Sequence, residues 1–133
     1  MIYLNSKVIE SALQGARNVY PNEFIALFRG SEKLQHGEKD GKSKDIEITD
    51  LIIPPFSDYS AHSSGFNPWH LPLSVDLIGS FHSHPYGNGQ PSQQDLNFFS
   101  TKGAFHVIAF PPFTSDSFRA YNSKGKPIAF KVL

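Results

Sequence analysis

Two histidines separated by one residue carry the clearest chemical signal in this chain. They are His82 and His84, at the end of a stretch that reads as a strand, Leu73–Ser83. Side chains at positions i and i+2 of a strand point to the same face, so both imidazoles can reach one metal ion. The glycine-containing residues 85–90 let the chain double back, so that Asp95 on a following helix can supply an oxygen ligand. Two histidines and one carboxylate are a typical catalytic zinc set that leaves a fourth position for water.

Hydrolysis at such a site needs a general base that is not itself a metal ligand. Zinc lowers the pKa of a bound water to about 7, and the base takes up the proton that this water loses. Each residue also has a purely structural interpretation. A histidine on a strand is more often packed or hydrogen-bonded than metal-bound, and Ser92 and Asp95 fit a capping box at a helix start. For Ser92 the two interpretations are compatible.

The spacing as a whole is more specific than its parts. His82-Ser83-His84-Pro85, six further residues, and then Ser92 and Asp95 resemble the signature of the JAMM/MPN+ zinc metalloproteases. Pro91 also stands where members of that family often have proline. The family has a glutamate at the start of a strand after the first helix, and Glu23 matches it. Ala26 departs from the family pattern, which commonly has glycine there.

The resemblance implies a fold, a cofactor and roles for these residues. The fold would be the cytidine-deaminase-like α/β fold of JAMM/MPN domains, a mixed sheet flanked by helices. One Zn2+ per chain would be held by His82, His84 and Asp95. Glu23 would act as general acid and base, and Ser92 would stabilise the oxyanion of the tetrahedral intermediate.

The implied activity is hydrolysis of peptide or isopeptide bonds at the C-terminal Gly-Gly of ubiquitin-like proteins, by a minimal prokaryotic, archaeal-type family member. Two alternatives stay open: a non-catalytic MPN-type scaffold that binds proteins, and a protease that processes the tails of ubiquitin-like sulfur carriers. Scaffolds typically lack one of the glutamate, histidine or aspartate positions, and all are present here. Zinc nucleoside deaminases need a cysteine pair, and this chain has no cysteine.

Composition bounds the remaining possibilities. A chain of 133 residues fits one domain, expected to span residues 1–133. Twelve Lys plus Arg balance twelve Asp plus Glu without a single-sign cluster, which argues against nucleic-acid binding. The sequence has no apolar run of membrane-spanning length and no signal-peptide pattern at its start, so we expect a cytoplasmic protein without membrane contact.

Hydrophobic periodicity predicts the elements that position the site. Their expected order is β-α-β-β-loop-β-α-β-β-β. The first helix should start at Asn5 or Ser6 and end near Tyr20, and the second should run from Pro91-Ser92 to about Ser100. The expected strands are Ile2–Leu4, Glu23–Arg29, Ile46–Ile53, Leu73–Ser83 and Phe105–Phe110, with a closing hairpin of Ser117–Tyr121 and Ile128–Val132.

Two further features each have more than one interpretation. Phe66, Trp69 and His70 lie in the irregular stretch Phe56–Pro72 and form either a partner surface or packing against the sheet. His106 lies in an apolar strand, where we expect a core residue or a residue that supports the site.

Overall fold

The computed structural model describes residues 1–34, 44–54 and 77–133 of the chain. The elements predicted from sequence appear in the predicted order. They are β1 (Ile2–Leu4), α1 (Ser6–Val19), β2 (Ile25–Leu34), β3 (Lys44–Ile52), β4 (Leu77–Ser83), α2 (Gln93–Phe99), β5 (Phe105–Ala109), β6 (Phe118–Tyr121) and β7 (Lys131–Val132). The fold is therefore the expected mixed α/β arrangement.

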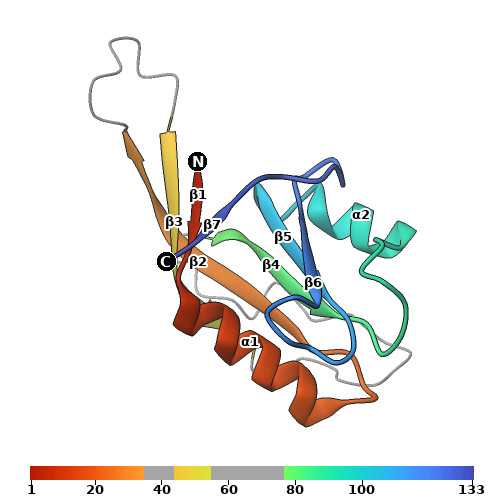
Figure 1. The fold of residues 1–133 in the computed structure, drawn as a ribbon. Helices are drawn as coiled ribbons and strands as arrows, with labels where there is room; N and C mark the ends of the chain where they lie inside the picture. The colour runs from red at the N-terminus through yellow and green to blue at the C-terminus, as the bar shows by residue number, and fades with distance from the viewer. Residues whose placement is uncertain (35–43, 55–76) are drawn as a thin grey trace.

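All seven strands form one mixed sheet in the order β6-β5-β4-β2-β3-β1-β7 (Figure 1). β4 and β5 are parallel, as β1 is to both β3 and β7, whereas β2 pairs antiparallel with β3 and with β4. β4, which carries His82 and ends just before His84, is thus an interior strand, held on one side by β2 and on the other by β5.

The two helices cover opposite faces of this sheet. Alternate residues of a strand point to opposite faces, and β5 separates its side chains accordingly. Phe105, Val107 and Ala109 join the large core that includes the apolar side of α1. Ile108 instead joins a smaller cluster with Phe99 of α2. Residues of β4 and β5 that point toward α2 therefore face the candidate site.

Local signals explain where α1 begins and ends. The Asn5 side chain accepts a hydrogen bond from the Lys7 backbone N–H and caps the first turn, as predicted. The helix buries one apolar stripe that includes Leu13 and stops at Val19, shortly before Pro21. Burial of a leucine side chain contributes about 1.5–3 kcal/mol, so this stripe attaches α1 firmly to the sheet.

The predicted end of the second strand at Arg29 was wrong, because β2 continues past Gly30 to Leu34 and pairs with β3 along that extension. The register shifts between Arg29 and Gly30, which marks a bulge. A Cβ at Gly30 would lie 2.0 Å from the Glu47 carbonyl oxygen. The glycine therefore allows close strand approach at the bulge, and does not stop the strand.

The predicted closing hairpin was wrong in its second strand. β7 is only Lys131–Val132, and it pairs in parallel with β1. The turn after β6 is present, with an isolated bridge between Tyr121 and Pro127 and backbone hydrogen bonds from Asn122 N–H to the Lys126 carbonyl and from Ile128 N–H to the Ala120 carbonyl. Proline has no N–H to donate to a strand ladder, so pairing with β6 is interrupted at Pro127. After Ile128 the chain crosses to the other edge of the sheet, where β7 pairs with β1.

None of the helices in the described ranges is long and apolar enough to cross a membrane. The stretch Phe56–Pro72, with Phe66, Trp69 and His70, lies outside the described residues. The same is true of the first part of the strand predicted at Leu73–Ser83, of which the structure describes Leu77–Ser83.

Candidate metal centre

The pleat of β4 directs Ser80 and His82 toward α2. The face is set by the alternation of β4, whose Phe81 points into the opposite core. The rings of Phe98 and Phe99 pack against the His82 ring, at centroid distances of 4.8 and 5.8 Å. His82 is only 3% exposed, so protein atoms and not water surround its imidazole.

His84 follows the end of β4 and continues its alignment with β5. Its backbone N–H donates to the Ala109 carbonyl oxygen at 2.8 Å. The preceding residue, Ser83, donates its backbone N–H to the Phe24 carbonyl oxygen and accepts the Phe24 N–H at its hydroxyl, at 2.9 and 2.7 Å. These bonds hold the segment that carries Glu23 beside the segment that carries His84.

The loop between His84 and α2 is anchored by residues that the sequence motif did not identify. Gly87 and Gly89 have φ angles of 96° and 85°, a left-handed conformation that glycine tolerates. Arg119 Nε donates to the Asn88 carbonyl oxygen at 2.7 Å, and the Tyr121 hydroxyl donates to the Gly89 carbonyl oxygen at 2.6 Å. β6 therefore fixes the path by which the chain returns to Ser92.

Ser92 and Asp95 form the capping box of α2. The Asp95 backbone N–H donates to Ser92 Oγ at 3.1 Å, and the Ser92 backbone N–H donates to Asp95 Oδ2 at 2.8 Å. The same Oδ2 lies 3.0 Å from His84 Nε2. The capping interpretation is thus correct, and it brings Asp95 to the histidines instead of excluding it from the site.

Asp95 lies close to both of the other sequence-predicted ligands. His84 Nε2 is 3.0 Å from Asp95 Oδ2, and His82 Nδ1 is 3.8 Å from Asp95 Oδ1. Two ligand atoms of a tetrahedral zinc lie about 3.3 Å apart when each is about 2.05 Å from the ion. Within the described part of the chain, no group of three such side chains is arranged so that it could already hold a metal ion. In this arrangement Asp95 bonds directly to His84. The donor set fits zinc, and Asp95 would exchange that bond for a shared ion.

Glu23 joins these groups at a small cavity. The cavity measures about 190 Å³, and its lining includes Glu23, His84, Ser92 and Asp95. Tyr86 and Gln94, which the sequence motif did not single out, also line it. Burial raises the pKa of the Glu23 carboxyl, the nearby His84 lowers it, and the Asp95 charge raises it further. A carboxyl with a raised pKa suits a group that both takes and gives a proton.

Burial and pairing shift the pKa values of the ligands in different directions. Burial lowers the pKa of His82 to about 4, so this ring is neutral at pH 7. Burial alone would lower the pKa of His84, but the hydrogen bond and charge of Asp95, with the charge of Glu23, raise it. Burial would raise the pKa of Asp95, yet the hydrogen bonds from His84 and the Ser92 backbone lower it. A charged His82 would lower the pKa of Asp95 as well. His82 is neutral at pH 7, so it adds no charge there.

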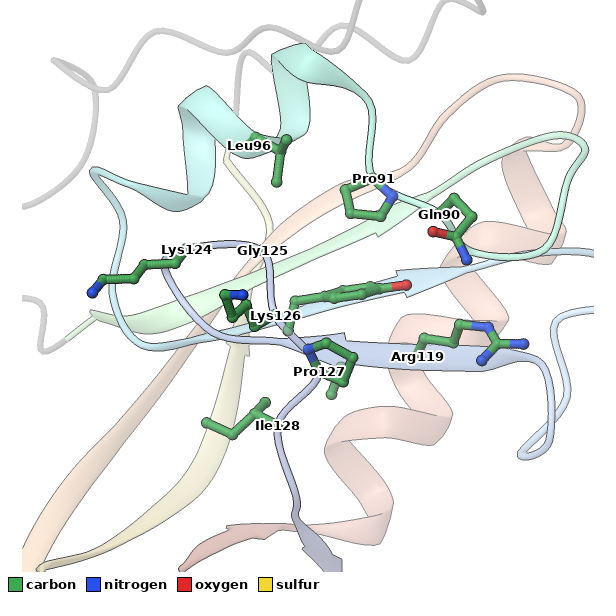
Figure 2. A pocket seen from close by; sticks show the side chains of 11 residues that line it. Gln90, Pro91, Leu96, Arg119, Lys124, Gly125, Lys126, Pro127 and Ile128 are labelled. Carbon is green, nitrogen blue, oxygen red and sulfur yellow. The ribbon is translucent and has the colours of Figure 1, made fainter.

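A larger cavity, about 670 Å³, lies away from the ligands, between α2 and the segment that follows β6 (Figure 2). Leu96 reaches it from α2, and Arg119, Lys124 and Lys126 reach it from β6 and the following turn. None of the residues that line it is an acid or a histidine. The larger of these two cavities is therefore not the one that holds the predicted metal ligands. Of these two cavities, only the smaller one is lined by groups able to bind a metal and move a proton.

Comparisons with known proteins identify the family of this chain. A Haloferax volcanii protein named "probable metalloprotease" is 29% identical over 134 residues, which cover 100% of this chain and 80% of that protein. A solved structure described as a JAMM metalloprotease-like zinc site in the proteasome and signalosome is 26% identical with a TM-score of 0.69, covering 100% of this chain and 98% of that one. A JAB1/MPN domain protein from Archaeoglobus fulgidus is 25% identical, with the same TM-score and 100% and 97% coverage. Residues 5–122 match the family of prokaryotic homologs of the JAB domain. The chain belongs to that family, as its histidine, serine and aspartate motif predicted.

Proposed function

We propose that this protein is a zinc-dependent metalloprotease that cleaves peptide or isopeptide bonds after the C-terminal Gly-Gly of ubiquitin-like proteins. The observation that carries the proposal is the convergence of Glu23, His84, Ser92 and Asp95 on one cavity, with His82 buried behind Asp95. The name of the Haloferax volcanii relative and the zinc site of the solved neighbour support the reaction class.

His82, His84 and Asp95 would hold the ion, and Glu23 and Ser92 would remain outside its ligand set. Zinc held there supplies a Lewis acid that lowers the pKa of water and polarises a carbonyl. Glu23 accepts the proton of the attacking water at its carboxylate and returns it to the leaving amine. Ser92 Oγ accepts the cap bond from the Asp95 N–H, so its own O–H proton is available to donate to the substrate oxyanion.

A ubiquitin-like tail is the substrate class that suits the small cavity. A Gly-Gly segment has no side chains, so it can closely approach a small site of about 190 Å³ whose lining includes the carboxylates of Glu23 and Asp95. Tyr86 is 80% exposed and lines the same cavity. An exposed aromatic ring at this position supplies an apolar surface for an extended backbone.

The test is metal content and cleavage, measured on the same preparations. We expect about one zinc per chain in the wild type, and cleavage of a ubiquitin-like protein fused through its Gly-Gly tail to a reporter. Glu23→Gln should keep the zinc and lose about 10²–10⁴-fold in rate, the usual contribution of general acid-base catalysis. His84→Ala should lose both. Glu10→Gln, an exposed glutamate on α1, is the matched control and should behave as wild type.

Ser92 is tested by two substitutions. Ser92→Ala removes both the cap and the hydroxyl donor, so it should lose about 10²–10³-fold in kcat and about 1 kcal/mol of stability. Ser92→Thr keeps a hydroxyl and should recover most of both. If the wild type carries no zinc and Glu23→Gln changes nothing, the protein is not a protease of this kind, and a protein-binding MPN domain becomes the better description.

A further inference from the structure

Two buried residues that no ligand assignment includes form a continuous hydrogen-bonded chain behind His82. Ser80 Oγ lies 3.0 Å from His82 Nε2 and 2.7 Å from His106 Nδ1. His106 Nε2 in turn lies 2.9 Å from the Gly103 carbonyl oxygen. Ser80 and His106 are opposite each other in the parallel β4–β5 pair, so the sheet register itself brings them together.

The direction of each hydrogen bond follows from the end of this chain. A carbonyl oxygen only accepts, so His106 Nε2 carries the proton that Gly103 receives. Burial lowers the pKa of His106 to about 4, against the effects of the Gly103 and Phe99 backbone. The ring is therefore neutral at pH 7, and its Nδ1 must accept. The one proton of the Ser80 hydroxyl then goes to His106, which leaves the Ser80 oxygen to accept from His82 Nε2.

This arrangement determines which nitrogen of His82 is free. When Nε2–H donates to Ser80, Nδ1 is the ring nitrogen left to present a lone pair, as a metal ligand must. Nδ1 is also the nitrogen that lies 3.8 Å from Asp95 Oδ1. A ring nitrogen and a carboxylate oxygen that both present lone pairs repel each other unless a cation lies between them.

We propose that Ser80 and His106 are positioning residues that hold His82 in the Nε2–H tautomer and so orient its Nδ1 as a metal ligand. Neither residue touches metal or substrate, and both act through His82. A ligand histidine usually donates its other N–H to a fixed acceptor, which sets the tautomer and ring orientation. Here the acceptor is a serine hydroxyl, and His106 determines the direction of that hydroxyl.

Ser80 and His106 together form a hydrogen-bonded relay to His82, and burial prevents water from taking the place of either residue. Ser80 and His106 are both 0% exposed, so water does not reach the hydroxyl to substitute for either partner. The His106 ring stacks on Phe99 at a centroid distance of 4.4 Å and an angle of 11°. That stacking fixes the plane of the ring, and with it the direction in which Nδ1 accepts.

The first test needs no substitution and no metal. Long-range ¹H–¹⁵N NMR spectra of the metal-free wild type at pH 7 report which ring nitrogen of each histidine carries the proton. We expect Nε2–H for both His82 and His106. A proton on Nδ1 of His82, or a mixture of its two tautomers, would overturn the proposal without any reference to activity.

The second test measures zinc affinity by competition with a chromogenic chelator. Ser80→Ala and His106→Phe should each bind zinc about 10–100-fold more weakly, the usual cost of losing such a supporting bond. His106→Phe keeps an aromatic ring to stack on Phe99. Ser80→Thr keeps the hydroxyl and should bind close to wild type, with the same His82 tautomer. Ser117→Ala removes another buried serine hydroxyl, bonded to Thr114 away from the site, and should leave the affinity unchanged.

A double variant distinguishes a relay from two unrelated losses. Because Ser80 and His106 act in series, Ser80→Ala/His106→Phe should be no weaker than the weaker single variant. Full additivity of the two losses would contradict the relay.

The inference rests on the proposed zinc site, and the outcomes separate the relay from the proposed function. Wild-type protein that binds no zinc refutes the proposed function, whereas zinc binding that Ser80→Ala leaves unchanged refutes only the relay.

Discussion

At the residue scale, Asp95 shows how one carboxylate can serve structure and chemistry together. Its Oδ2 accepts from the Ser92 backbone N–H and lies 3.0 Å from His84 Nε2. The helix cap therefore fixes the side chain whose oxygens face the histidines. A capping residue is held in one rotamer, and that order is present before any ligand binds.

The His84–Asp95 contact predicts how the stability of the metal-free protein depends on pH. The pKa of His84 is raised above 6.5, so its contribution is full below 6.5 and is lost as pH rises through the folded value. The pKa of Asp95 is lowered below 3.8, so its contribution is present above 3.8 and is lost as pH falls. The ionised pair therefore stabilises most between these two values.

Asp95→Asn should accordingly cost most near pH 5. Asparagine can still accept the cap bond from Ser92, so the variant removes the charge and keeps the helix start. We expect a loss of about 1.5–3 kcal/mol at pH 5, the range for hydrogen bonds to charged groups, and a smaller loss at pH 8. Urea unfolding with a chelator present measures both. An equal loss at the two pH values would show that the pair is not ionised.

At the scale of the element, the site depends on how closely β5 approaches β4. A Cβ built on Gly79 would lie 1.5 Å from the Phe105 carbonyl oxygen. This distance is far inside contact between atoms, and the obstacle is backbone that cannot rotate away. Gly79 is therefore required one residue before Ser80, where the register places Ser80 opposite His106.

Gly79→Ala should destabilise the protein by about 3 kcal/mol or more. The added methyl group would force β4 and β5 apart, which costs more free energy than ordinary overpacking of a core. Gly87→Ala is the matched control. Gly87 has a φ of 96°, but among the described residues, apart from its chain neighbours, no atom lies within 4 Å of the place that an alanine Cβ would take. Alanine there should therefore cost about 1 kcal/mol from backbone strain alone. Denaturant unfolding compares the two, and similar losses would mean that the β4–β5 approach is not tightly constrained.

Elements whose signals are local were predictable, and contacts that depend on pairing were not. Asn5 before α1 and Ser92 before α2 lie next to the helices that they cap, so the sequence shows both. The partner of β7 lies at the other end of the chain, in β1, and no local pattern identifies it. The link from Ser80 to His106 likewise needs the β4–β5 register, although the spacing of Ser80 two residues before His82 placed it on the correct face.

At the scale of the whole molecule, the site draws on segments that are distant in the chain but adjacent in the sheet. Glu23 precedes β2, His84 follows β4, and Asp95 belongs to α2, while β6 anchors the loop between the last two. The sheet order places these strands together at β6-β5-β4-β2. β3, β1 and β7 form the other half of the same sheet, and β7 is its edge strand (Figure 1).

Because the site lies on one half of the sheet and β7 on the other, we expect that a change at β7 can lower stability without lowering zinc affinity. Leu133 accepts from the Ser6 backbone N–H at 2.8 Å and donates its own N–H to the Leu4 carbonyl oxygen at 2.9 Å. Deletion of residues 131–133 removes both bonds and the β1–β7 pairing, so we expect a loss of at least about 2 kcal/mol, at about 1 kcal/mol for each of the two Leu133 hydrogen bonds. Zinc affinity should be unchanged, because β7 is four strands away from β4 in the sheet order. Thermal unfolding and chelator competition on the same protein measure the two quantities. A parallel fall in zinc affinity would mean that the far edge of the sheet is coupled to the metal ligands, and that the sheet responds to change as one cooperative unit.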